Sequence, residues 1–250
     1  MFGEQRPAAP AVLAGLIFRP GFRPSRDAFR ELAGQGLFSL SERGKPENAG
    51  GGHAGGKDFL ELLHDGLAFD VAGLDPGPPV ALPRPVHRFG RLEDEVGLEA
   101  IALLPGLHIA GGAHMIPVVK AAVSLLHILQ VLPGLCAITW CPAANLVDPE
   151  WFRASTAKWL SGGPFPAFAL VSLVENSEGQ VASHGLRFLG GCEFRFDPPG
   201  RLNAMAMAIR LLDWLAMQGR IHAPCTVAIP GIGEVVIEPA NDGNIIVRGV

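Results

Sequence analysis

The sequence predicts an α+β fold, with a mixed, mainly antiparallel sheet and helices packed on one face in two layers. Three helical patterns, at 117–132, 149–160 and 202–218, are interleaved with short apolar runs of strand length. Several of those runs follow one another directly, and one pair is joined by Asp242-Gly243, a strong hairpin signal. Strands that are adjacent in sequence favour this arrangement over a doubly wound parallel sheet.

The chain opens with a predicted β-α unit. An apolar run at 11–18 is predicted to be a strand, and Ser25 is placed to cap a short amphipathic helix over 26–33. The segment 59–63 is compatible with a helical turn or a short strand, and 67–71 with a strand.

Two segments of the N-terminal part are poor in regular patterns. Residues 44–57 contain many glycines, and we expect a mobile loop there. Residues 75–85 are rich in proline and are predicted to be extended surface chain.

The first long helix is predicted to be buried on more than one side. A strand at 98–104, continuing to 109 with a break near Pro105, precedes it, and Pro117 stands in its first turn. Its polar residues Lys120, Ser124 and His127 form one narrow stripe, and the rest of its surface is apolar.

The middle of the C-terminal part alternates strands with one capped helix. We expect a strand at 135–141, a helix capped by Asp148, and a β-hairpin formed by 167–175 and 181–188. A further strand is predicted at 192–196.

The last helix and the tail give the clearest patterns. Leu202 begins a helix with one apolar stripe, and Gly219 is placed to end it. Three short strands follow at 225–229, 234–238 and 244–248. We therefore predict an N-terminal region, 1–95, with a β-α unit and Gly/Pro-rich loops, and a compact α+β domain over 96–250. The alternative is one continuous domain.

Composition excludes several classes of protein. The 250 residues include 32 Gly and 22 Pro, only 18% are charged, and the net charge is -4. The apolar content of 48% is too high for a disordered chain, and the glycines lack the three-residue period of collagen. Nucleic-acid binding is not predicted, because no basic patch is present.

Targeting signals are not evident, and a cytoplasmic location is predicted. The four cysteines form no CxxC pair, which is unlike a disulfide framework or a zinc site. The apolar run near the N-terminus lacks a small-residue cleavage site. The longest apolar stretch, 115–135, is interrupted by polar residues and prolines, so no membrane association is predicted.

Motifs of catalysis and cofactor binding are weak. Residues 51–58 fit G-x-x-x-x-G-K but have Asp58 where a phosphate-binding loop needs Ser or Thr, and no strand precedes them. There is no G-x-S-x-G and no HExxH. We predict no cofactor, no metal and no catalytic residue, and favour a protein that is not an enzyme.

One speculative ligand pocket remains, where the strand 135–141 meets the helix 149–160. It would contain His114, Trp140, Cys141 and His184, and a Cys/His nucleophilic pair would use Cys141 with either histidine.

The region 96–250 resembles an uncharacterised bacterial family, a domain of unknown function. The resemblance rests on the strand and apolar helix before Leu135, on 137–140 with 146–152, on 166–190, and on the last helix with the terminal strands. It implies a fold but no activity, so it assigns no catalytic residue.

The high apolar content and low charge favour a non-enzymatic α+β module that associates with a partner protein or with itself. The alternative is a small-molecule-binding or hydrolytic protein that uses the pocket near Trp140 and Cys141.

Overall fold

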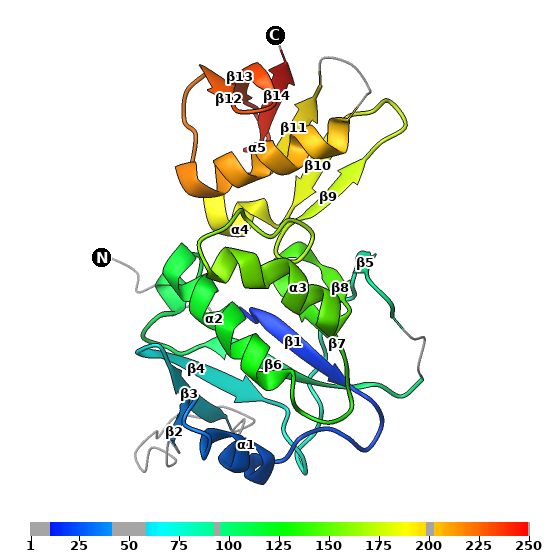
Figure 1. Cartoon of the computed structure of the whole chain (residues 1–250), viewed down its shortest axis with the longest axis vertical. Coiled ribbons are helices and arrows are strands. Elements are labelled where there is room, and N and C mark those ends of the chain that lie inside the picture. The colour runs from blue at the N-terminus through cyan, green and yellow to red at the C-terminus, as the bar shows by residue number, and fades with distance from the viewer. Residues whose placement is uncertain (1–10, 42–58, 93–95, 199–202, 250) are drawn as a thin grey trace, which may run out of the picture. The chain divides into compact units, whose positions relative to one another are not determined.

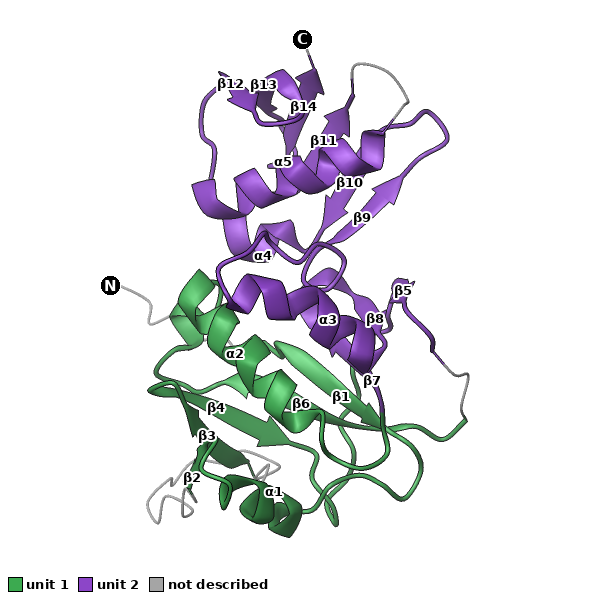
Figure 2. Ribbon diagram, viewed as in Figure 1, with its two compact units in different colours: residues 1–82, 95–135 green, residues 83–94, 136–250 purple. Residues whose placement is uncertain are grey.

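The fold is known from a computed structural model that describes residues 11–41, 59–92, 96–198 and 203–249. The chain forms two compact units, shown in Figure 2. Unit 1 contains residues 1–82 and 95–135, and unit 2 contains 83–94 and 136–250. The predicted α+β class, with mixed and mostly antiparallel sheets, is confirmed.

Unit 1 is built on five antiparallel strands. Their spatial order is β2-β3-β4-β6-β1. Their bounds are β1 Ala14–Phe18, β2 Ser39–Ser41, β3 Leu60–His64, β4 Leu67–Ala72 and β6 Glu99–Pro105. The residues at 59–63, compatible with a turn or a strand, therefore belong to a strand, because β3 finds partners on both sides.

Among its described residues, unit 1 also contains two α-helices and a 3-10 turn. Helix α1, Arg26–Ala33, is capped as predicted, since the Ser25 hydroxyl accepts a hydrogen bond from the Ala28 N–H. Helix α2, Ile116–Leu129, follows the 3-10 turn η1, Ala110–Gly112, and packs against β4. No helix of the described residues is both long and apolar enough to cross a membrane.

The polar stripe of α2 contributes to the interior of unit 1. Nε2 of the buried His64 lies 3.0 Å from the Ser124 hydroxyl, and Nδ1 lies 3.1 Å from the Leu37 carbonyl oxygen. One polar residue of the stripe is thus used to satisfy a buried imidazole.

Arg23, in the segment between β1 and α1, has a structural role. Its side chain is 6% exposed, forms ion pairs with Asp75 and Glu99, and donates a hydrogen bond to the Gly73 carbonyl. The carboxylates of Asp75 and Glu99 thus compensate the buried positive charge of Arg23 within unit 1.

Unit 2 begins with three strands and one helix. Strands β7, Leu135–Trp140, and β8, Asn145–Val147, are antiparallel, and β5, His87–Phe89, pairs with β8 in parallel. The 3-10 turn η2, Cys141–Ala143, joins β7 to β8. Helix α3, Pro149–Leu160, is capped as predicted by Asp148, whose carboxylate accepts from the Trp151 N–H.

A six-stranded sheet forms the rest of unit 2, with the order β12-β13-β14-β11-β10-β9. All its pairs are antiparallel except β11 with β14. Its elements are β9 Ser172–Glu175, β10 Val181–His184, β11 Phe194–Asp197, β12 Cys225–Ile229, β13 Gly233–Pro239 and β14 Ile245–Gly249. Helix α5, Ala204–Gln218, packs on this sheet against β9, β10 and β12 (Figure 1).

The predicted hairpin exists, but both of its strands are shorter than expected. Residues 172–175 pair with 181–184, whereas Phe168 has a φ of +64° in an irregular segment. After Gly185, at φ +102°, the chain forms the short helix α4, Leu186–Gly190, in place of a longer strand.

Glu193 explains that helical turn. Its carboxylate accepts hydrogen bonds from the N–H groups of Gly185, Leu186 and Arg187 and from the Ser183 hydroxyl. The N–H groups at a helix start lack partners within the helix, so a carboxylate there stabilises the turn.

Three predictions concern residues outside or partly outside the described ranges. The mobile loop at 44–57 and the phosphate-loop-like 51–58 fall within 42–58, which is not described. The predicted start of the last helix, Leu202, is also outside them. The two units do not coincide with the predicted regions 1–95 and 96–250, and the compact domain over 96–250 stays a prediction.

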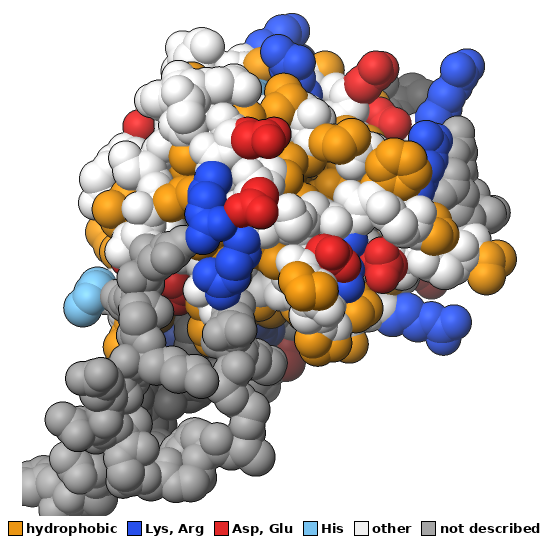
Figure 3. All heavy atoms as spheres, turned by 90° about the horizontal axis from the view of Figure 1, so that it is seen from below, with side chains coloured by type: hydrophobic (Ala, Val, Ile, Leu, Met, Phe, Trp, Pro, Cys, Tyr) orange, Lys and Arg blue, Asp and Glu red, His pale blue; other side chains and the backbone are white. Residues whose placement is uncertain are grey.

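The surface drawn in Figure 3 mixes side chains of different kinds. Apolar side chains are interspersed there with acidic and basic ones. On this face, apolar groups and charges of both signs therefore lie side by side.

Candidate functional site

The four residues of the predicted pocket come from three segments of the chain, and their convergence on one cavity stays a prediction. His114 is exposed in the turn between η1 and α2, in unit 1. The other three belong to unit 2: Trp140 ends β7, Cys141 begins η2, and His184 ends β10.

Trp140 is a core residue. Its side chain is fully buried and meets the Phe188 ring edge to face, with ring centroids 6.0 Å apart. The indole Nε1 is buried without a hydrogen-bond partner among the described residues. The packing agrees with the usual use of tryptophan in protein interiors.

Cys141 is held as a neutral thiol. Burial raises its pKa to about 11, although hydrogen bonds with the Thr139 side chain and with its own backbone act in the opposite direction. The thiolate is the nucleophilic form of cysteine, so this environment opposes nucleophilic catalysis at neutral pH.

Asn145 holds the backbone around Cys141 in place. Its side chain is fully buried, accepts a hydrogen bond from the Trp140 N–H at 2.8 Å, and donates to the carbonyls of Phe168 and Ala169 at 2.9 Å. One amide thus satisfies three backbone groups from two segments of unit 2, which is a structural role.

His184 is paired with a residue that the sequence did not single out. Nδ1 of His184 lies 3.2 Å from Nε2 of His87, and the rings meet edge to face at 83°. Burial, with the nearby His184 as the second cause, lowers the pKa of His87 below its ordinary 6.5, which favours the neutral imidazole.

A row of aromatic rings extends from this pair along β5. The His87 ring stacks near Phe89, which in turn contacts the rings of Trp151 and Phe168 at centroid distances of 5.9 and 5.2 Å. These contacts attach β5 to the rest of unit 2.

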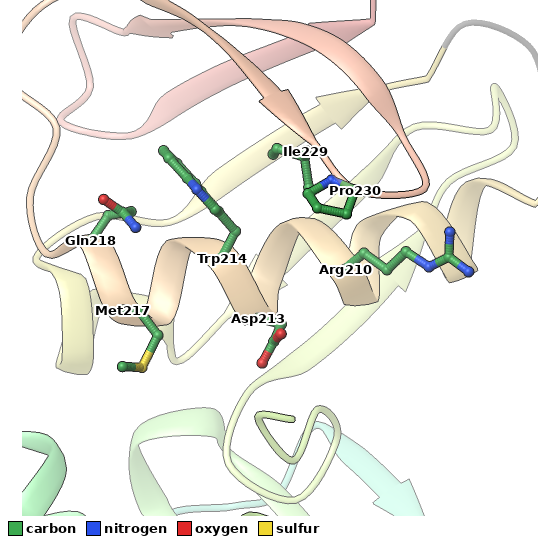
Figure 4. Close-up of a pocket in the computed structure, with 7 residues that line it drawn as sticks. All are labelled: Arg210, Asp213, Trp214, Met217, Gln218, Ile229 and Pro230. Carbon is green, nitrogen blue, oxygen red and sulfur yellow. The ribbon is translucent and has the colours of Figure 1, made fainter. Parts of the chain in front are cut away.

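A surface pocket lies between α5 and the end of β12 (Figure 4). Its volume is about 410 Å³, within the range of ligand and side-chain binding sites. Five lining residues recur at helical spacing on the side of α5 away from its buried stripe, and β12 and the following turn supply two more. The lining is Arg210, Asp213, Trp214, Met217, Gln218, Ile229 and Pro230.

The walls of this α5 pocket are fixed by specific contacts. Nη1 of Arg210 donates a hydrogen bond to the Gly231 carbonyl at 2.8 Å, and the Asp213 carboxylate accepts one from the Phe165 N–H at 2.6 Å. The lining also includes Trp214 and Met217, and Met217 is 67% exposed. The pocket thus combines an apolar centre with one cationic and one anionic side chain.

Strand β12 forms the edge of the sheet next to this pocket. Among the described residues, no strand pairs with its outer side. Its sequence, Cys225-Thr226-Val227-Ala228-Ile229, contains neither a charge nor a proline, whereas β9 at the opposite edge ends in Glu175. Charges, prolines and bulges are the usual means of preventing edge pairing, and β12 has neither of the first two.

The sequence signals for these features were uneven. Helical spacing places residues 210, 213, 214, 217 and 218 on one face of the last helix. The same spacing predicts that Trp214 and Met217 lie opposite the buried stripe of that helix. Nothing local indicates that His87 meets His184, which lies 97 residues later. Among the described residues, no group of three or more His, Cys, Asp or Glu side chains is placed to hold a metal ion.

Comparison with known proteins gives no relative for this chain. No protein-family model, no curated protein and no solved structure matches it. The function is therefore argued from the chain's own geometry.

Proposed function

We propose that this protein is a self-associating module, in which the β12 edges of two copies pair and the two α5 pockets face each other. The observation that carries this proposal is an uncharged edge strand beside an apolar pocket, in the same unit. Association, and not catalysis, is the proposed activity.

The edge supplies the backbone part of the interface. An unpaired strand edge presents N–H and C=O groups that bind readily to another strand. Because each copy has the same edge, two β12 strands can pair antiparallel about a two-fold axis, which is the commonest symmetry of soluble oligomers. Such pairing joins the two six-stranded sheets.

The α5 pocket supplies the side-chain part. Trp, Met and Arg are enriched at protein interfaces, and buried Trp and Arg often contribute most of the binding energy. Ordering the exposed Met217 against the partner's Trp214 removes apolar surface from water.

Charge complementarity favours a second copy as the occupant. Arg210 and Asp213 stand three residues apart on α5, so each copy presents both signs. Two such surfaces related by a two-fold axis can place unlike charges opposite each other without leaving a net charge at the interface.

The oligomeric state tests this proposal. Light scattering coupled to gel filtration of the wild-type protein is expected to show a concentration-dependent dimer. Thr226→Lys together with Ala228→Lys, two exposed positions of β12, is expected to give monomer, because charges on an edge strand oppose pairing. Trp214→Ala is expected to weaken the dimer by about 2 kcal/mol, roughly thirtyfold.

The matched control is Val174→Lys on β9, the opposite edge, where the side chain is 45% exposed. It is expected to leave the dimer intact. The proposal is overturned if the wild-type protein stays monomeric at every concentration tested. This holds even if the monomer binds a different protein. A dimer that survives the β12 changes but is lost with Val174→Lys overturns the assignment to β12.

A further inference from the structure

We infer that His87 and His184 form a two-histidine binding site for a divalent cation of the kind that prefers imidazole, such as Ni²⁺, Zn²⁺ or Cu²⁺. The site is independent of the β12 edge and the α5 pocket, because it uses different elements of unit 2.

The distance between the two nitrogens suits a shared cation. Metal–imidazole bonds are about 2.0–2.1 Å long. A cation about 2.1 Å from both Nε2 of His87 and Nδ1 of His184, which are 3.2 Å apart, would subtend an angle of roughly 100°. That value lies between the octahedral and the tetrahedral angle, both of which imidazole-binding metals adopt.

The backbone segments that carry both rings are anchored to the same short segment, residues 143–145. On the β5 side, His87 pairs with Asn145 in register, and its N–H donates to the Ala144 carbonyl at 3.2 Å. Asn145 is itself fixed by three hydrogen bonds. The position of the first ligand is therefore set before any cation binds.

The His184 side is anchored to the same segment. The Ser172 hydroxyl, from the strand paired with β10, donates to the Ala143 carbonyl at 3.2 Å. Gly185 packs so closely that an added Cβ would lie 2.7 Å from Ala143 Cα. The backbone positions of the two ligands are thus set before a cation binds, which reduces the entropy lost on binding.

The proposed site has two protein ligands, Nε2 of His87 and Nδ1 of His184. Because no third protein ligand joins them among the described residues, water molecules complete the coordination shell.

Titration of untagged protein with Ni²⁺ by calorimetry tests the site. One Ni²⁺ per chain is expected to bind at pH 7.5 and to be released by a chelator. We expect His87→Gln and His184→Gln each to weaken Ni²⁺ binding at least about tenfold. Removal of a residue that only hydrogen-bonds to a metal ligand already costs about that much affinity, and these variants remove a ligand itself. Far-ultraviolet circular dichroism of both variants checks that they are folded.

His114→Gln and His222→Gln are the controls, because both side chains are exposed and lie on other segments. They are expected to retain the wild-type affinity. Absence of binding to the wild-type protein overturns the inference, and so does binding that either of the two pair variants leaves unchanged. Equal losses in the controls and the pair variants overturn it as well, because scattered surface histidines would then be responsible.

Discussion

At Cys141, burial has a larger effect on the thiol than its hydrogen bonds. Burial alone would favour the neutral form, and the contacts with Thr139 only reduce that effect, leaving the pKa at about 11. The side chain is neither a metal ligand nor a nucleophile at neutral pH in this state, since both need the thiolate.

We therefore predict slow alkylation of Cys141. At pH 8, a pKa of about 11 leaves roughly one thiol in a thousand ionised. Iodoacetamide labelling of the folded protein, followed by peptide mass spectrometry, is expected to show a rate at Cys141 that is low at pH 7 and rises steadily up to pH 10. Rapid labelling at pH 7 would contradict this prediction and revive the Cys/His hypothesis.

Residue roles that depend on neighbours in sequence could be predicted. Ser25 and Asp148 cap their helices as the sequence indicates, because a cap needs only the N–H groups two or three residues ahead. The pairing of His87 with His184 and the contacts of Asn145 with 168–169 depend on how distant segments meet.

At the scale of elements, the turn between β12 and β13 depends on one glycine. Gly231 has a φ of +76°, and an added Cβ would lie 1.7 Å from Nη1 of Arg210. The guanidinium would have to move away and lose its hydrogen bond to the Gly231 carbonyl. Arg210, as a wall of the α5 pocket, links this turn to the proposed interface.

We predict that Gly231→Ala is more destabilising than Gly233→Ala. Both residues have positive φ, which costs an alanine about 1–2 kcal/mol, but the space around Gly233 is open. Loss of the Arg210 hydrogen bond should add about 1 kcal/mol. Urea denaturation of both variants measures the difference, and the prediction is wrong if Gly233→Ala is equally destabilising. If the interface is as proposed, Gly231→Ala also lowers the dimer fraction.

The elements themselves were largely predictable where apolar periods are long. Helices α2, α3 and α5 and the three C-terminal strands occur close to their predicted positions. The error at 185–188 has a physical cause, since the carboxylate of Glu193, several residues later, satisfies the N–H groups of α4 and ends the strand. A strand pattern cannot reveal a partner of that kind.

At the scale of the whole molecule, His87 makes stability depend on pH. Its pKa is lowered in the folded protein, so the unfolded chain binds a proton more readily as pH falls below about 6.5. The neutral imidazole of His87 therefore contributes stability above pH 6.5. That contribution is lost as the pH falls from 6.5 to the lowered pKa of His87 in the folded protein. Burial is the first cause of the lowered pKa of His87, and the neighbouring His184, from β10, is the second.

We predict that acidification from pH 7.5 to 5.5 lowers the free energy of unfolding less in His87→Gln than in the wild-type protein. One proton gives a slope of at most about 1.4 kcal/mol per pH unit. Urea denaturation at several pH values measures the slopes, with His222→Gln as an exposed control. Identical slopes for wild type and His87→Gln would show that His87 is not responsible.

The sequence by itself determined the α+β class, the positions of the main helices and their caps, and the C-terminal hairpins, because these depend on periods and turn residues within about twenty positions. Only the tertiary structure decided that Trp140 lies in the core, that Cys141 is held neutral, and that His184 meets His87. It also decided that β12 is an edge beside Trp214 and Met217. The physical reason is that burial and long-range pairing arise from segments distant in sequence, and these set the chemistry of each side chain.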